Sequence, residues 1–478
     1  MAQMQPDRVA LIWFRQDLRL ADNPALTAAV AAGQSILPLY VLDDDAAAPW
    51  QTGGAHRWWL HHSLRSLAAS LRKFGAPLLL RRGSAAAIVP EMARAVGAAE
   101  VHAGTLPEPW ARAQAAAVAA ALGDIPLRLH RASTLFDFDS IKTKTGGVYG
   151  VYGPFAKACH ARGDIAPPLP TPDRIDPGPA QPSDDLDSWG LLSTKPDWAA
   201  GFRDTWTPGE AGAADRLTRF MAGPVCGYDI GRNVPGKHLT SMLSPHLHWG
   251  ELSPAQVWDA AQKAGSGPAH DVFNGEILWH EFSAYLLWHF PHLPEKPLRP
   301  DFARMQWRDD TASLRAWERG QTGVPIVDAG MRQLWQIGWM HNRVRMITAS
   351  FLVKHLLVSW QAGEAWFWDT LVDGDLAANS ASWQWIAGSG IDSQPFFRVF
   401  NPVTQGEKFD AAGAYVRRWV PELAALPDRW LHAPWTAPAD VLARADVALG
   451  DTYPKPLVDL AAGRDRALAA FKTMRQVA

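Results

Sequence analysis

The sequence of 478 residues predicts an N-terminal α/β domain with a doubly wound parallel sheet, joined by a long linker to an all-α domain. Three observations support this prediction. Short apolar runs alternate with helical patterns up to about residue 132, a proline-rich stretch follows to about residue 205, and the rest has almost wholly helical periodicity. The predicted domains are therefore residues 1–132 and 206–478, with the linker at 133–205.

In the first domain, five apolar runs have the length of strands, at 9–14, 36–42, 77–80, 100–103 and 127–129. Helical patterns lie between the later runs, at 55–74, 85–97 and 110–122. This alternation favours a parallel sheet, because a helix provides the crossover that parallel strands need. The first run is followed by Trp13 to Asp17 and not by G-x-G-x-x-G, so a Rossmann dinucleotide site is not expected.

The linker and the second domain differ from the first domain in proline content and in the periodicity of their apolar residues. Prolines at 167, 168, 170, 172, 177, 179 and 182 indicate a long connection over the surface. In the second domain the clearest helical pattern covers 325–358 and opens with Pro325, a residue suited to the first turn of a helix.

Charge and cysteine content limit the possible functions. Lysine and arginine total 46 against 48 aspartates and glutamates, a net charge of −2, so any contact with DNA needs a local basic patch. Two cysteines, Cys159 and Cys226, are too few for a disulfide framework or a four-thiolate cluster and suit a reducing compartment.

No apolar run approaches the roughly 18 residues of a membrane span, and no signal peptide is evident. We expect a cytoplasmic protein.

Tryptophan is the unusual component of the composition. The chain has 24 tryptophans against 18 phenylalanines and 7 tyrosines. Each buried indole N–H needs a hydrogen-bond partner, so core packing alone rarely uses so many indoles. Some of these side chains are therefore candidates for a functional role.

Residues 373–385 combine two carboxylates, a carboxamide and two indoles, at Asp373, Asp375, Asn379, Trp383 and Trp385. A calcium loop starting at Asp373 needs a glycine and a glutamate where Ala378 and Gln384 stand, so no metal is expected. The carboxylates could cap the next helix. They could also pair with Arg343 or Arg345, which interrupt an apolar helix and need partners when buried.

Five segments resemble the photolyase/cryptochrome family, specifically its bacterial members that act on cyclobutane pyrimidine dimers. They are 13–19, 338–346, 373–379, 383–385 and 397–409, they occur in the family's order, and the resemblance covers residues 8 to about 422. It implies that the helical domain holds FAD. In the family, light drives an electron from reduced flavin to a thymine dimer flipped out of DNA, the cyclobutane ring splits, and the electron returns. DNA containing pyrimidine dimers is therefore the expected partner.

The resemblance also implies which residues hold the flavin. The matching positions are Tyr228, Thr240, Ser241, Leu243 and Ser244 for the phosphates and ribityl chain, Trp339, Asn342, Arg345, Asp373 and Asp375 around the isoalloxazine, His280 near the cofactor, and Asn379 beside the flavin N5. The carboxamide of Asn379 can hydrogen-bond a protonated N5 without adding charge.

For the lesion, the matching polar contacts are Glu276 and Asn342, and the apolar walls are Met346, Trp279 and Trp385. A protonated Glu276 could donate to a carbonyl that gains charge when the electron arrives. Plain core packing is the alternative for the two indoles.

Two further sets match positions with a role in the family. Trp307, Trp360 and Trp383 match a chain of indoles that carries electrons from solvent to the flavin. Contacts to DNA phosphates around the flipped lesion are matched by Arg232, Arg343, Arg398 and Lys408. The alternatives are core packing for the indoles and a solvated charged face for the cations.

The sequence departs from the family in three places. His280 stands where the family has arginine and Phe273 where many members have tryptophan, so we expect a pH-dependent step in flavin redox state or DNA binding. The common contacts of a folate antenna are missing, and Trp50 and residues 107–111 lie in their places. These indoles could stack a pterin, fill the pocket or pack, so a second chromophore, a folate or a deazaflavin, is left open.

The leading hypothesis is a light-driven lyase that acts as a monomer with no obligate protein partner. A cryptochrome, a blue-light sensor on the same fold, is the alternative. Asn379, Met346 and Glu276 favour repair, because sensory relatives often carry Asp or Cys in place of the asparagine and (6-4) enzymes carry histidine in place of the methionine. A flavin-dependent dark oxidoreductase is a third hypothesis, which no nicotinamide site supports.

Overall fold

The computed structural model describes residues 8–163, 165–193, 195–393 and 398–476, so Phe397, the first residue of the last motif, lies outside the described part. The chain divides into two compact units. Unit 1 comprises Met1–Gly223, Ser241–Pro291 and Val372–Ala377, and unit 2 comprises Pro224–Thr240, His292–Leu371 and Ala378–Ala478. The domain boundaries expected at residues 132 and 205 stay a prediction.

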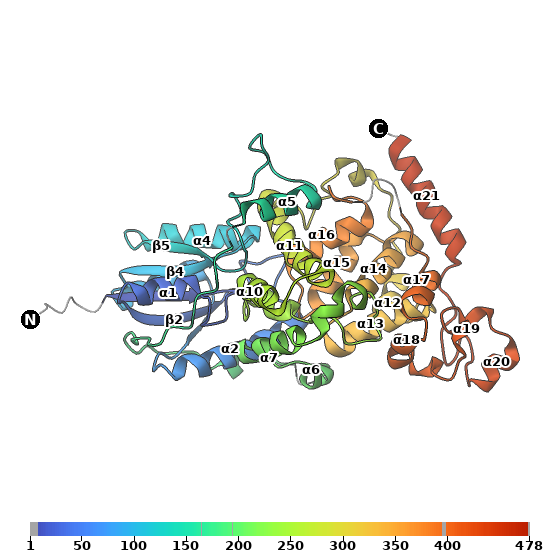
Figure 1. The fold of residues 1–478 in the computed structure, drawn as a ribbon, viewed down its shortest axis with the longest axis horizontal. Helices are drawn as coiled ribbons and strands as arrows, with labels where there is room; N and C mark the ends of the chain where they lie inside the picture. The colour runs from blue at the N-terminus through green and yellow to red at the C-terminus, as the bar shows by residue number, and fades with distance from the viewer. Residues whose placement is uncertain (1–7, 164, 194, 394–397, 477–478) are drawn as a thin grey trace, which may run out of the picture. The chain divides into compact units, whose positions relative to one another are not determined.

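Unit 1 contains a five-stranded sheet whose paired strands are all parallel (Figure 1). Its strands are β1 Val9–Phe14, β2 Ser35–Leu42, β3 Leu79–Arg82, β4 Glu100–Thr105 and β5 Leu127–Arg131, in the order β3-β2-β1-β4-β5. An order that runs outward on both sides of the first strand is the doubly wound arrangement. The predicted fold class of this region is therefore confirmed.

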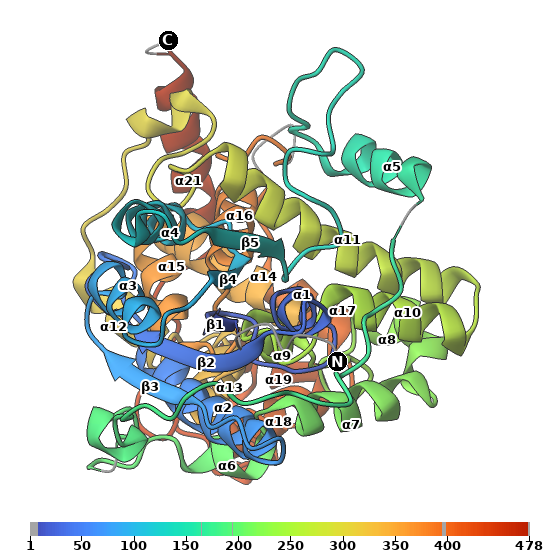
Figure 2. The same cartoon turned by 90° about the vertical axis from the view of Figure 1, so that its left-hand side faces the viewer.

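Helices cover both faces of this sheet (Figure 2). They are α1 Pro24–Ala31 and α2 Gly54–Arg72 on one face, and α3 Ala85–Ala95 and α4 Pro109–Leu122 on the other. Right-handed crossovers require this distribution for the observed strand order. Leu11, Leu39 and Val101 of the strands pack with Val89 and Val118 of the second pair of helices.

The rest of unit 1 consists of further helices joined by long irregular segments. Its elements are α5 Tyr152–Arg162, η1 Leu186–Trp189, α6 Ala200–Thr205, α7 Glu210–Met221, α9 Ser244–His248, α10 Pro254–Ala264 and α11 Pro268–His289. Ser253 begins α10 with a capping box, in which its hydroxyl accepts from the Gln256 N–H and the Gln256 side chain accepts from the Ser253 N–H.

The named elements of unit 2 are all helices, as predicted, and irregular segments join them. Its elements are η2 Pro224–Gly227, α8 Tyr228–Gly231, η3 Pro300–Arg304, α12 Thr311–Glu318, α13 Pro325–Ile337, α14 Asn342–Ser350, the π-helix η4 Phe351–Leu356, α15 Trp360–Thr370, most of α16 Leu376–Ala387, α17 Pro402–Phe409, α18 Ala414–Trp419, η5 Pro421–Leu423, α19 Asp428–Leu431, η6 Pro434–Thr436, α20 Ala439–Arg444 and α21 Leu460–Gln476.

The helical pattern over 325–358 is confirmed, with Pro325 at the start of α13, and it is divided into α13, α14 and η4. Gly338 ends α13 with a φ of 65°, a conformation that favours glycine, and its N–H donates to the Leu334 carbonyl. The chain then restarts at His341, whose ring accepts a hydrogen bond from the Arg343 N–H and so caps α14. Because α14 begins at Asn342, Arg343 and Arg345 lie in its first turn and not in the middle of a longer helix.

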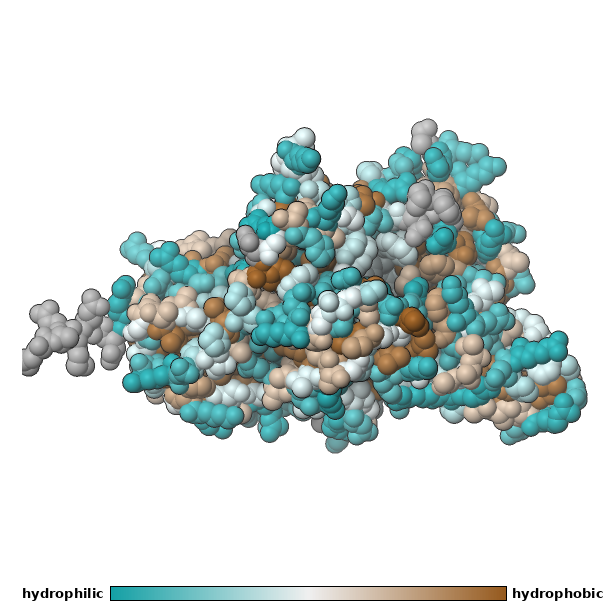
Figure 3. All heavy atoms as spheres, in the orientation of Figure 1, coloured by the Kyte–Doolittle hydropathy of each residue, from teal (hydrophilic) through white to brown (hydrophobic). Residues whose placement is uncertain are grey.

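The visible face carries small, scattered apolar groups among hydrophilic residues (Figure 3). Ile230, at 74% exposure, and Trp335, at 50%, are the most exposed large hydrophobic side chains of the described residues. Within the described ranges, no helix combines the length and the apolar character that a membrane span requires.

Candidate cofactor and DNA site

The loop before α9 and the 372–377 segment meet within unit 1. The Ser244 hydroxyl donates to the Asp373 carboxylate at 2.6 Å, and the Leu243 N–H donates to the Ser241 hydroxyl at 3.4 Å. Met242 between them has a φ of 50°, unusual for a residue with a side chain and common at ligand sites. The predicted residues Ser241, Leu243 and Ser244 therefore lie in one loop, and a hydrogen bond joins this loop to the predicted residue Asp373.

Three histidines surround Asp375. The Nδ1 atom of His248 lies 4.0 Å from the Asp375 carboxylate, and the His248 ring stacks on His56 with centroids 5.0 Å apart. The pKa of His280 is lowered by burial and by His248 and is raised in part by Asp375. His280 is therefore mainly neutral near pH 7, where the family's arginine would carry a charge.

Glu108 belongs to the same cluster, which sequence reasoning did not identify. Its side chain is 1% exposed, and its Oε2 atom has no hydrogen-bond partner in the part of the chain that the structure describes. Burial, reinforced by the charge of Asp375, raises the pKa of Glu108 to about 7. Glu108 immediately precedes α4. The only feature of the sequence that pointed to it was its place in residues 107–111, where the common folate contacts of the family are missing.

Helix α11 carries the predicted residues Glu276, Trp279 and His280 on one face, because positions three and four apart are neighbours on a helix. The Trp279 ring stacks on Tyr152 at 3.7 Å with the planes 7° apart. The Tyr152 hydroxyl donates to the Gly275 carbonyl at 2.8 Å and fixes this arrangement. Tyr152 was not predicted, since it lies 127 residues before its partner and no local pattern marks it.

Phe273, the second departure from the family, is buried in α11 and packs on Phe220 of α7 with ring centroids 4.9 Å apart. This contact lies within the core of unit 1. A phenylalanine there fills space without needing the hydrogen-bond partner that an indole N–H would require.

In unit 2, Asn379 is anchored by the neighbouring helix. Its amide nitrogen donates to the Glu364 backbone carbonyl at 3.0 Å, which leaves the amide oxygen available as an acceptor. Glu364 is fully buried and accepts from the Ser380 hydroxyl at 2.5 Å. Burial raises the pKa of Glu364 well above its usual value and so favours the neutral form of this carboxyl.

The start of α14 holds several predicted residues. The Arg345 Nε donates to the Met340 carbonyl at 2.7 Å, and its guanidinium lies 5.8 Å from the centre of the buried Trp339 ring. Asn342 is exposed at the first position of the helix. Of these residues, Asn342 is the most accessible to a ligand.

Arg343 connects the predicted phosphate contacts to the predicted lesion wall. Its guanidinium donates to the Asn233 side-chain oxygen at 2.5 and 3.2 Å and to the Met346 sulfur at 3.5 Å. It also lies 4.6 Å from the centre of the Phe409 ring, which Lys408 approaches at 5.3 Å. Arg232, next to Asn233 in the chain, lies over the Tyr228 ring at 5.7 Å.

The predicted indole chain lies in unit 2. Trp383 is 2% exposed and packs on Trp317 and Phe367, with ring centroids 6.2 and 5.0 Å away. A Cβ atom at Gly363 would lie 2.2 Å from the Trp383 ring, so this glycine allows the close packing. Trp360, also 2% exposed, begins α15, and the half-buried Trp307 packs against a core cluster that includes Phe302 and Leu357.

Trp385 lines an open pocket together with Arg398, so the predicted lesion wall and one predicted phosphate contact share this hollow. The buried Lys354 also lines it, and burial lowers the pKa of its amine to about 7. Lys354 lies in the π-helix, an element frequent at functional sites.

The residues present fit a flavin dinucleotide. In unit 1, Ser241 and Ser244 supply hydroxyls, and the His248 and His280 Nδ1 atoms are buried without a hydrogen-bond partner among the described residues. In unit 2, Asn379 supplies an oriented amide. No three or more His, Cys, Asp or Glu side chains gather as metal ligands in the described ranges. Thr240, in unit 2, stays a prediction, and so does the expected pairing of Asp373 with Arg343 or Arg345 across the two units.

Comparison with known proteins places these residues in a family context. Residues 10–173 match the model described as DNA photolyase, and residues 273–473 match the FAD binding domain of DNA photolyase. The deoxyribodipyrimidine photo-lyase of Agrobacterium fabrum is 49% identical over 98% of this chain and 98% of its own length. Cryptochrome-1 of Arabidopsis thaliana is 35% identical over 98% of this chain and 71% of its own length.

Solved structures agree with the sequence comparison. A bacterial class III photolyase from Agrobacterium tumefaciens superposes with a TM-score of 0.96 at 48% identity, covering 100% of this chain and 99% of its own. The Synechocystis cryptochrome superposes with a TM-score of 0.87 at 26% identity, covering 98% of this chain and 100% of its own.

Proposed function

The chain belongs to the photolyase/cryptochrome family, and we propose that it repairs cyclobutane pyrimidine dimers in DNA by a light-driven lyase reaction. The observation that carries this proposal is the likeness to a deoxyribodipyrimidine photo-lyase along almost the whole chain. FAD is the cofactor, and when reduced and illuminated it supplies the electron that opens the cyclobutane ring.

We assign the flavin site to the residues named above. The Ser244 hydroxyl donates a hydrogen bond to Asp373, so the loop before α9 is fixed before a ligand binds. Asn379 presents its amide oxygen as an acceptor, because Glu364 occupies its nitrogen. Burial, which raises the pKa of Glu364, disfavours a negative charge on the carboxyl next to this position. Both features suit a flavin that is kept reduced.

We assign the lesion site to Glu276, Trp279, Asn342, Met346 and Trp385. The stacking of Tyr152 on Trp279 supports a rigid wall, because one face of the indole is already covered. The contact of the Arg343 guanidinium with the Met346 sulfur supports a site in which a phosphate contact lies beside the apolar wall. Extrusion of a dimer into such a site costs less than extrusion of an intact base.

A blue-light sensor is the second candidate, because cryptochromes are among the relatives. Asn379 and Met346 oppose it, as the sequence predicts. The second chromophore, a folate or a deazaflavin, stays a prediction. A monomer in the cytoplasm is also proposed, and the free cysteines Cys159 and Cys226 support a reducing compartment.

The proposal is tested with the purified, pre-reduced protein and a short oligonucleotide containing one thymine dimer. Under blue light the dimer is expected to revert to two thymines, and in the dark it should persist. Bound FAD without loss of dimers in the light would overturn the enzyme and favour the sensor.

A further inference from the structure

A second group of exposed basic side chains lies next to the predicted phosphate contacts of unit 2. It consists of Lys237, His238 and Arg418, here called the second basic patch, and all three side chains are exposed. An Nη1 atom of Arg418 lies 3.5 Å from the His238 Nε2 atom. The first basic patch is Arg232, Arg343 and Lys408.

The two patches are physically continuous. Asn233, which binds the Arg343 guanidinium, and Lys237 belong to one short segment that turns twice, with the Val234 N–H donating to Gly231 and the Lys237 N–H donating to Val234. A Cβ atom at Gly236 would lie 3.1 Å from Ala414 Cβ, so this segment lies against the start of α18. Arg418 follows in the same helix.

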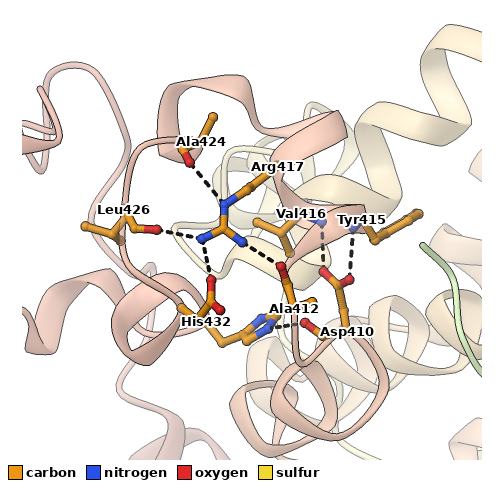
Figure 4. Close-up of polar contacts among 9 residues, drawn as sticks. Asp410, Ala412, Tyr415, Val416, Arg417, Ala424, Leu426 and His432 are labelled. Carbon is orange, nitrogen blue, oxygen red and sulfur yellow. Dashed lines mark hydrogen bonds and ion pairs between the residues drawn. The ribbon is translucent and has the colours of Figure 1, made fainter.

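Neighbouring arginines differ in what they bind. The Arg417 guanidinium donates to three carbonyls and one carboxylate, of Ala412, Ala424, Leu426 and Asp428, at 2.6 to 3.0 Å (Figure 4). Arg418 has no carboxylate partner among the described residues, and neither does Lys237. Arg417 is thus a structural anchor, whereas Arg418 and Lys237 are uncompensated charges.

A carboxylate close to this patch, Asp410, is already bound by backbone groups, and a Cβ atom at Gly236 would lie 3.4 Å from its Oδ1 atom. Asp410 is buried and accepts from the Tyr415 and Val416 N–H groups at 2.9 Å, as Figure 4 shows. The Tyr415 hydroxyl in turn donates to Gln333, whose oxygen also accepts from the His341 N–H at the start of α14. This chain of hydrogen bonds fixes α18 relative to the helix that carries Arg343, so both patches have one rigid support.

We propose that Lys237 and Arg418, with His238, bind phosphates of the DNA that flanks the lesion. This inference rests on the proposed function for the identity of the partner. Five residue steps separate Arg232 from Lys237, a reach of at most about 18 Å. The segment turns twice, so its ends lie closer together than this limit, and at about 3.4 Å per base pair along one strand the second patch reaches phosphates fewer than about five base pairs from those that Arg232 contacts. The patch binds backbone and carries no sequence preference.

The test measures the salt dependence of DNA binding by the full-length protein. Fluorescence anisotropy with an undamaged 24-base-pair duplex is recorded from 50 to 300 mM KCl. Each lost phosphate contact reduces the slope of log K against log salt by about 0.9, so Lys237→Ala with Arg418→Ala should reduce it by about 1.8. Arg418→Lys with Lys237→Arg should retain the slope, because the charges remain.

A matched control removes the same charge elsewhere in unit 2. Arg429 and Arg444 are exposed, with Arg429 over the Trp430 ring and Arg444 paired to Asp440, and their replacement by alanine should leave the slope unchanged.

An unchanged slope in the double variant, or an equal loss in the control variant, would overturn the second patch. Failure of the proposed function has a different signature, because light-driven repair would then be absent in the wild type while the difference in salt slope persists. Bound flavin and the melting temperature, measured for each variant, verify that the fold is intact.

Discussion

Replacing Glu108 with glutamine is expected to stabilise the protein in a pH-dependent way. Glu108 is 1% exposed, and burial together with the charge of Asp375 raises its pKa from 4.5 to about 7. Below pH 4.5 the carboxyl is protonated in the folded and the unfolded chain and has no effect. As the pH rises towards 7, the unfolded chain releases the proton while the folded chain keeps it, so stability falls.

The size of this effect follows from the shift of the pKa. Each pH unit in that window costs about 1.4 kcal/mol of unfolding free energy, so the loss reaches about 3.4 kcal/mol near pH 7 and stays constant above it. Glutamine has nearly the same shape and does not ionise. The variant should therefore match the wild type near pH 4.5 and exceed its unfolding free energy by up to about 3 kcal/mol at pH 7.5.

The assay is urea unfolding of both proteins at pH 4.5, 5.5, 6.5 and 7.5. Glu91→Gln, at an exposed position of α3 in the same unit, is the control and should show no such trend. A stability difference that does not change with pH, or a wild type more stable than the variant at pH 7.5, would refute the reasoning.

Three other predictions concern the site. Trp383→Phe should abolish photoreduction of the flavin and spare repair by the pre-reduced protein, and photoreduction retained by the variant, followed by absorbance, would refute the assignment. Asn379→Asp should speed reoxidation of the reduced flavin in air, because a carboxylate places negative charge beside it, and an unchanged rate would contradict this role. His280 has a lowered pKa, so DNA binding or flavin state should change below pH 6.5 and His280→Arg should flatten that profile, whereas equal profiles would exclude the histidine.

The sheet was largely predictable because its strands are buried apolar runs. β1 has the expected bounds, Val9–Phe14. β3, at Leu79–Arg82, lies two residues later than the expected run at 77–80. The strand continues through Arg81 and Arg82 because it is an edge strand, where charged side chains are tolerated. Helix α1 was missed although Asn23 and Pro24, a cap followed by a first-turn proline, gave a local signal.

The site was predictable where a motif carries it and not where tertiary packing does. The motif includes Asn379, but its anchor Glu364 lies in another helix, and only the packing of α15 against α16 brings them together. Likewise, nothing near Trp279 in the sequence indicates Tyr152. Part of the rise in the pKa of Glu108 comes from the charge of Asp375, in the 372–377 segment, which is distant in the chain.

The central claim is tested most directly by lesion specificity. The pre-reduced protein is illuminated with blue light in the presence of two oligonucleotides, one with a cyclobutane thymine dimer and one with a (6-4) photoproduct, and intact thymines are quantified against dark controls. The account predicts restoration of the cyclobutane dimer alone and only in the light. Repair of neither lesion, or restoration that proceeds equally in the dark, would contradict it.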